Sequence, residues 1–292
     1  MNTPLFRLLA IRALRLSGAS ALLGLSLSPL LVRADSATIE PTTWYYSGPS
    51  SAVTSGEDGL TFTTKATADY PTSIRHVLTY FTSTTLANSG DSLSVSLTFS
   101  GQLNNPTNYA FNFAFYDSGG SQIPENGLGQ GSGSSSPFFN YTGYRVGIRA
   151  QASTTTQPFE LRTRSVANAV LGSTSAHTGE TAGGPASSTA LTSGASYNIT
   201  YTITRIDPAN LGISISVTGA GLGDNYNGSW TVASTYTTFD TFAITIGGAS
   251  AFDSITLSDV VITTTAIPEP STVSVLLGAG GLIAALVFRR RR

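Results

Sequence analysis

A strict alternation of apolar and polar residues is the feature of this sequence that most limits its fold. From Leu93 to Phe99, every second residue is apolar and the residues between them are Ser or Thr. Successive side chains of a β-strand point to opposite faces, so this stretch predicts a strand with one buried face and one face in water. The same pattern recurs at 109–115, 144–148, 159–161, 197–203, 213–217, 242–246 and 255–257, and more weakly at 60–64 and 75–81.

These strands predict an all-β domain over residues 35–265. Gly, Pro, Asn or Asp separate most of them, and no stretch of the domain keeps a helical spacing of apolar residues. About ten strands favour two packed antiparallel sheets in one jelly-roll-like β-sandwich. Two linked smaller sandwiches are the alternative, with the boundary in the Gly-, Ser-, Thr- and Ala-rich segment 172–194. We expect that segment to be a loop, because too few strands follow it to form a second sandwich.

The C-terminal tail has three parts in a fixed order. Pro268, Glu269 and Pro270 come first, and an uncharged run of 17 residues follows at 272–288. At about 1.5 Å per residue this run spans roughly 25 Å as a helix, the short end of what a bilayer accepts. The chain then ends in four arginines, which we expect on the cytoplasmic side of the membrane: Arg289, Arg290, Arg291 and Arg292.

This order of parts at 266–292 resembles the bacterial PEP-CTERM sorting signal. The resemblance implies processing by an exosortase, a membrane-embedded enzyme similar to cysteine transpeptidases, at or near 268–270. It also implies an inner-membrane precursor whose mature domain ends in the cell envelope or in an extracellular matrix that contains exopolysaccharide. The resemblance covers the tail alone, so it says nothing about what the sandwich does.

The first 34 residues predict a signal peptide. Arg7, Arg12 and Arg15 form a basic segment without an acid, and a leucine-rich apolar run follows at 19–32. Small residues near position 34 place the expected cleavage after Ala34. An amphipathic surface helix is the alternative. An exported N-terminus agrees in topology with a C-terminus anchored by cytoplasmic arginines.

Removal of both ends changes the charge of the protein. Seven Lys or Arg and 15 Asp or Glu lie between residues 35 and 267, so this region carries −8, whereas the whole chain carries −1. Such an acidic surface repels nucleic acid, and we expect no nucleic-acid partner. The chain has no cysteine, which excludes disulfides and cysteine-based chemistry.

The strand order in the second half of the domain gives a further resemblance. A paired hairpin at 197–205 and 213–217, followed by strands at 239–244 and 253–260, is similar to the concanavalin A-like (laminin G/lectin/glucanase) sandwiches of bacterial surface proteins. That family implies a fold, and it makes a carbohydrate-binding module the alternative to a non-catalytic matrix protein. A glycoside hydrolase is the less favoured third function.

The sequence does not mark a catalytic site. Glycoside hydrolysis needs two carboxylates held about 5 to 10 Å apart across a cleft, whereas Glu160, Asp240 and Asp253 each lack a second acid at a suitable spacing in their own strand. His76 and His177 are expected to face solvent. We therefore expect no catalytic residue, no metal ligand and no cofactor.

Exposed aromatic rings would be the signature of sugar binding. Phe138, Phe139 and Tyr141 are the favoured contacts because they follow a Gly- and Ser-rich segment in a connection. Trp44–Tyr46 and Trp230 are further candidates, although most aromatic residues of a sandwich belong to its core. The loop 223–228 has oxygen donors that are compatible with a structural calcium ion, but a turn at Asn227–Gly228 explains it equally well, so no such ion is placed.

Overall fold

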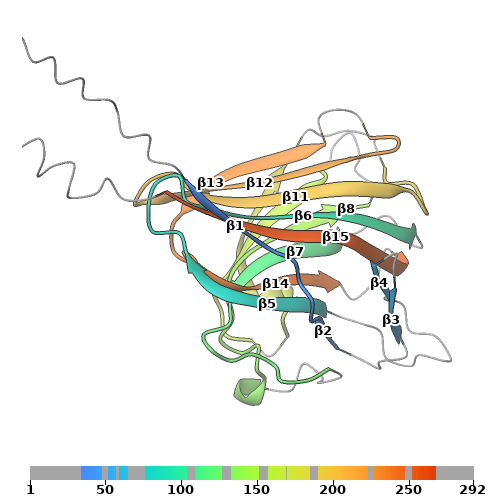
Figure 1. Cartoon of the computed structure of the whole chain (residues 1–292), viewed down its shortest axis with the longest axis horizontal. Helices are drawn as coiled ribbons and strands as arrows, with labels where there is room; N and C mark the ends of the chain where they lie inside the picture. Colours follow the sequence, from blue (N-terminus) through green and yellow to red (C-terminus); the bar gives the residue numbers. More distant parts are fainter. Residues whose placement is uncertain are drawn as a thin grey trace, which may run out of the picture. The chain divides into compact units, whose positions relative to one another are not determined.

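A computed structural model gives the structure of residues 34–47, 52–56, 59–64, 76–103, 109–126, 133–150, 157–168, 170–184, 190–222, 226–246 and 252–267. These residues form two antiparallel sheets, with eight and seven strands, and two short 3₁₀ turns at η2 (Gly133–Ser135) and η3 (Thr174–Ala176). The expected all-β sandwich is confirmed (Figure 1).

The eight-stranded sheet has β6 and β15 near its centre. In spatial order it contains β13 (Asn227–Ala233), β12 (Asn210–Gly219), β11 (Ser196–Arg205), β6 (Ser92–Leu103), β15 (Phe252–Ala266), β4 (Gly59–Thr63) and β3 (Val53–Gly56), with β1 (Asp35–Ile39) also paired to β15. Strand β15 has a bulge between Ser258 and Val261, where Asp259 has a φ of 52°. The bulge divides the strand, so that its first part pairs with β4 and its second part with β1.

The seven-stranded sheet lies against the eight-stranded sheet. Its spatial order is β10 (His177–Gly183), β9 (Phe159–Arg164), β8 (Thr142–Arg149), β7 (Tyr109–Asp117), β14 (Thr238–Ile246), β5 (His76–Thr85) and β2 (Tyr45–Tyr46). Strands from the two halves of the chain therefore pair with each other in both sheets: β11 pairs with β6, and β14 pairs with β5 and β7. This interleaving makes one sandwich and excludes a division at 172–194.

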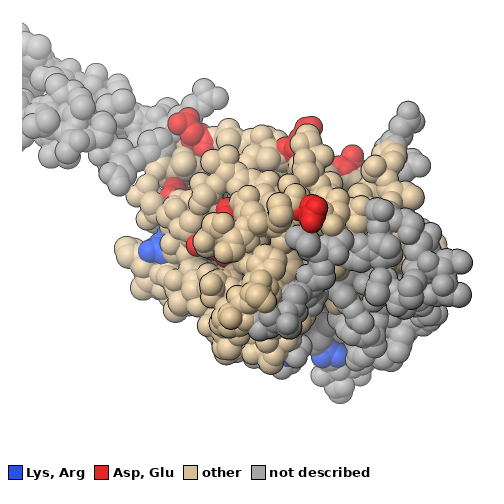
Figure 2. Space-filling view, turned by 90° about the horizontal axis from the view of Figure 1, so that it is seen from below, with Lys and Arg blue, Asp and Glu red and all other residues tan. Residues whose placement is uncertain are grey.

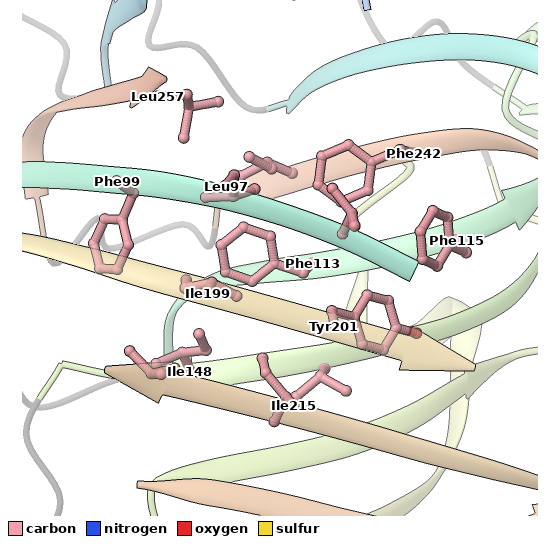
Figure 3. Packing of buried hydrophobic residues seen from close by; sticks show 14 of the residues in the cluster. Leu97, Phe99, Phe113, Phe115, Ile148, Ile199, Tyr201, Ile215, Phe242 and Leu257 are labelled. Carbon is pink, nitrogen blue, oxygen red and sulfur yellow. The ribbon is translucent and has the colours of Figure 1, made fainter. Parts of the chain in front are cut away.

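The alternating apolar residues meet between the two sheets. Figure 3 shows side chains of β6 and β11 facing those of β7, β8 and β14 across this space. Phe115 of β7 stacks on Tyr201 of β11 with ring centroids 5.2 Å apart, and the Tyr201 hydroxyl donates to the carbonyl of Tyr144 at 3.2 Å. The buried phenol therefore keeps a hydrogen-bond partner while its ring joins the core.

Trp230 closes one edge of the sandwich. Its indole lies between β13 and β10, and its N–H donates to the carbonyl of Ala182 at 3.4 Å. An added Cβ would lie 2.2 Å from this ring at Gly183 and 2.7 Å from it at Gly228. Glycine at these two positions therefore lets the ring fill the gap between the edge strands.

Two local predictions are wrong. The segment 172–194, expected as a loop, contains strand β10, which pairs with β9 through a bulge after Thr178. Asn227 and Gly228, expected in a turn, begin β13. In both places Gly, Ser and Thr make the sequence look like a loop, but pairing to a neighbouring strand decides the structure.

In the residues that the structure covers, we find no helix of the length and apolarity that crossing a membrane requires. The predicted signal peptide up to Arg33, the apolar run 272–288 and the arginines 289–292 lie outside the described residues.

We expect Leu97→Asp to unfold the domain and Ser96→Asp to leave it folded. Leu97 is buried between the sheets, whereas Ser96 is exposed on the opposite face of β6. An unpaired buried charge costs several kcal/mol, a large share of the roughly 5 to 15 kcal/mol that stabilises a domain. Thermal unfolding of residues 35–267 measures the difference, and equal melting temperatures for the two variants would contradict the assigned faces.

Candidate functional site

The outer side of the seven-stranded sheet is largely covered by other parts of the chain. A second apolar cluster fills this layer, made of Leu78, Ala114, Tyr116, Ile123, Phe138, Tyr141, Leu171 and Ala243. Phe138 and Tyr141 are 0% and 1% exposed, so the prediction that they present open rings to a sugar is wrong. Phe139 between them is partly exposed. The connection that carries these residues folds back onto the sheet because its aromatic rings are buried there.

Arg164 holds this covering layer in place. Its guanidinium is 0% exposed and donates to five backbone carbonyls at 2.8 to 3.0 Å, those of Phe138, Tyr141, Asn168, Val170 and Leu171. Burial lowers the pKa of the guanidinium, but its five N–H groups match carbonyls that would otherwise be buried without donors. Arg164 therefore ties two connections to the end of β9.

The two histidines belong to the same buried layer, and the expectation that they face solvent is wrong. His76 is 0% exposed and packs edge to face against Phe138, with ring centroids 4.7 Å apart. His177 is 5% exposed, with its Nδ1 at 2.7 Å from the carbonyl oxygen of Ser173 and its Nε2 at 3.2 Å from the hydroxyl of Tyr116. Because a carbonyl only accepts, Nδ1 carries the proton and Nε2 accepts from Tyr116.

Burial controls the protonation of both rings. Desolvation lowers the pKa of His76 from 6.5 to about 3. For His177, desolvation and then the positive charge of Arg145 lower the pKa from 6.5 to about 2. Both histidines are therefore neutral at physiological pH and do not act as charged groups.

The acids of this sheet serve as structural anchors. Glu160 is buried and forms ion pairs with Arg162 and, at 3.9 Å, with Arg145. Asp240 accepts hydrogen bonds from the backbone amide of Ser118 at 2.8 Å and from side-chain hydroxyls. In the ranges that the structure covers, no three His, Cys, Asp or Glu side chains come together as a metal site would require.

The outer side of the eight-stranded sheet is open and has a different chemistry. On β6, β11, β12 and β13 the outward positions are Ser, Thr, Asn, Gln, Gly or Ala, and none of them is charged. We call the outward surface of these four strands the hydroxyl face. The strand register aligns Ser94, Thr202, Ser214 and Ser229 in one row across all four strands.

A shallow hollow of about 320 Å³ opens on the hydroxyl face, at the lower end of the range typical of small-molecule sites. It is lined by Thr204, Gly212, Ile213, Ser214, Ser229, Trp230 and Thr231. Gly212 supplies no side chain at its floor, and a Cβ there would lie 3.2 Å from the Ile206 side chain, which is 44% exposed. The hollow is therefore lined by hydroxyl groups, and the exposed Ile206 side chain lies beside Gly212 without being part of the lining.

The remaining predicted ligand contacts are not assembled into a ring platform. Trp230 is 8% exposed and contributes to the wall of the hollow, with its indole N–H turned toward β10. Trp44, Tyr45 and Tyr46 are partly buried, and Trp44 packs against Phe242 with ring centroids 6.5 Å apart. Residues 223–225 of the calcium candidate lie outside the described residues. The hollow was missed because its residues look like ordinary strand residues in the sequence.

The buried histidines predict that acid destabilises the protein. Both pKa values are lower in the folded state than the value of about 6.5 in the unfolded chain, so the unfolded chain binds more protons as the pH falls below 6.5. The free energy of unfolding should then fall by about 1.4 kcal/mol per pH unit for each histidine. His177→Gln should reduce this slope between pH 6.5 and 5, measured by urea unfolding, and an unchanged slope would contradict the assignment.

A comparison with solved structures finds lectins among the proteins of similar structure. Peanut lectin, solved with a nine-residue peptide, is 14% identical, with 81% of this chain and 99% of that chain covered and a TM-score of 0.44. Winged bean acidic lectin, solved with methyl-α-D-galactose, is 10% identical over 81% and 100% of the chains, with a TM-score of 0.45. The alginate lyase Aly36B in complex with an alginate trisaccharide has a TM-score of 0.38, with 10% identity over 78% and 88% of the chains. Likenesses as loose as these give no information on function.

No curated protein matches the chain. The tail, in contrast, has a clear match: residues 266–292 fit the family model of the PEP-CTERM protein-sorting motif. The predicted sorting residues Pro268, Glu269 and Pro270 lie outside the described residues, whereas Ala34, the predicted signal-peptide cleavage residue, lies directly before β1. The chain thus carries, directly after its last strand, the sorting motif of an exported protein that is anchored in the membrane before an exosortase processes it.

Proposed function

We propose that this chain is an exported, exosortase-sorted protein whose mature sandwich remains in the cell envelope or the extracellular matrix and does not catalyse a reaction. The sorting motif at 266–292 carries the proposal, because it begins where the last strand of the sandwich ends. The charge of −8 between residues 35 and 267 favours solubility of the domain outside the cell after its release. The anchoring roles of Glu160 and Asp240 support the absence of catalysis.

Replacement of the sorting tripeptide should stop processing. We expect Pro268→Ala with Glu269→Ala to accumulate as an uncleaved, membrane-bound precursor in a host that contains an exosortase. The control is Ser271→Ala with Thr272→Ala, two neighbouring changes outside the tripeptide, which should mature normally. Precursor and mature forms are separated by gel electrophoresis of membrane and medium fractions. Maturation of the tripeptide variant at the wild-type rate would show that the tail is a plain anchor.

A second candidate function is the binding of a neutral polysaccharide by the hollow on the hydroxyl face. Ser and Thr hydroxyls donate and accept hydrogen bonds as sugar hydroxyls do, and Ile206, which lies beside the hollow next to Gly212, offers an apolar contact to the C–H groups of a sugar ring. The absence of charge on this face and the overall acidity of the domain favour neutral over acidic chains.

We expect the mature domain to be retarded in native gels that contain dextran and not in gels that contain alginate. Ser229→Tyr fills the hollow with a residue that strands tolerate well, and it should weaken the retardation at least about tenfold. The control Ser83→Tyr places the same side chain at an exposed position of β5 in the other sheet. Equal retardation of the two variants would exclude the hollow as the site. Release of reducing ends from either polysaccharide would contradict a non-catalytic domain.

A further inference from the structure

The last described residue of the chain, Ile267, is bound to the sandwich through both of its backbone polar groups. Its amide N–H donates to Asp91 Oδ1 at 2.7 Å, and its carbonyl oxygen accepts from the side-chain amide of Asn88 at 3.3 Å. Strand β15 ends one residue earlier, at Ala266. These contacts therefore extend the ordered chain to the residue directly before Pro268.

Asp91 uses its second oxygen to order the turn that leads into β6. Asp91 Oδ2 accepts from the backbone amides of Ala87 at 2.9 Å and Asn88 at 2.7 Å, and the residue is only 3% exposed. One buried carboxylate thus connects the β5–β6 turn to the end of the fold. Hydrogen bonds to a charged acceptor are stronger than neutral ones, so this carboxylate is a firm anchor.

Gly90 lets the Ile267 side chain pack against the same turn. Its φ of +94° is unfavourable for other residues, and an added Cβ would lie 2.9 Å from Ile267 Cγ1. Its amide donates to the carbonyl of Arg205 at 2.8 Å, which fixes the turn to β11. We call Asn88, Gly90, Asp91 and Ile267 together the exit clamp.

The first strand of the domain strengthens this end of β15. Asp35 and Ala266 are register partners in the β1–β15 pair, and Thr265 is paired to Ser92 of β6 on its other side. The end of β15 is therefore an inner strand. The predicted cleavage after Ala34 and the last strand residue before the sorting tripeptide, Ala266, therefore lie at the same end of the sheet.

We infer that the population of the opened exit clamp sets the rate at which the sorting motif is processed. The inference rests on the proposed sorting function, and it concerns the opening that precedes cleavage. An enzyme that cuts at or near 268–270 has to bind chain on both sides of the bond, and on the N-terminal side that chain is bonded into the sheet. When opening and closing are fast, cleavage of a folded protein follows the population of its locally opened form. Asp91 is then a positioning residue for the sorting step.

Removal of the Asp91 carboxylate tests this inference in the full-length chain, expressed in a host with an exosortase. Asp91→Ala should increase hydrogen exchange of the amides of 265–267 at least about tenfold, and it should shorten the half-life of the precursor at least about threefold. Asp91→Asn keeps one acceptor oxygen, so its hydrogen exchange and its precursor half-life should lie between those of Asp91→Ala and the wild type. The matched control is Asp240→Ala, which removes another buried carboxylate that accepts a backbone amide and should leave the half-life of the precursor unchanged.

A spacer keeps the test decisive if Asp91→Ala does not fold. Insertion of Gly-Ser-Gly-Ser between Ile267 and Pro268 leaves the clamp intact but frees the chain before the motif, so it should accelerate processing as Asp91→Ala does. A chain with both Asp91→Ala and the spacer should be processed no faster than a chain with either change alone. An unchanged or longer half-life in a folded Asp91→Ala variant, or in the spacer variant, overturns the inference while sorting itself stands. A wild-type chain that is never processed overturns the sorting function and the inference together.

Discussion

The contact between the two apolar sheet faces is the interaction on which the rest of this structure depends. The chain has no cysteine, so burial of the alternating side chains has to supply the stability that disulfides give to many exported domains. Aliphatic and aromatic residues share the contact, and the stacking of Phe115 on Tyr201 is one of its aromatic pairs (Figure 3). Since β6 pairs with β11 and β15, the core forms only when distant parts of the chain come together, which makes the domain one cooperative unit.

The two outer faces of this sandwich have opposite chemistry, and the difference explains where function can reside. On the seven-stranded sheet, Arg164, Glu160 and the two histidines are buried, and Arg164 holds the covering connections in place. A buried guanidinium is costly, but here it satisfies five carbonyls that would otherwise lack a donor. On the eight-stranded sheet, the hydroxyl face remains open and uncharged. Few charged side chains are visible in the view of Figure 2, where most described atoms are neither basic nor acidic.

The alternation in the sequence predicts the strands and the inner face well, because it reports on one buried side of each strand. The alternation does not show that connections cover the outer side of the seven-stranded sheet as a further layer. In β14, Thr241 and Thr245 occupy positions that read as solvent-facing, yet both are fully buried beneath the covering connections. The exposure predicted for Phe138, Tyr141, His76 and His177 fails for the same reason. The exit clamp cannot be predicted from the sequence pattern because Asp91 and Ile267 are 176 residues apart.

The position of β15 links the completion of the fold to the sorting motif. β15 is the last strand that the structure describes, but it lies inside the eight-stranded sheet, between β6 and the strands β4 and β1. Before β15 docks, its neighbours β6, β4 and β1 each have an unpaired edge, which is the condition that favours aggregation of β-proteins. The sheet cannot close until residues up to Ala266 are available, and the sorting motif follows at once. The strand that completes the sheet and the motif that directs sorting are therefore consecutive in the chain.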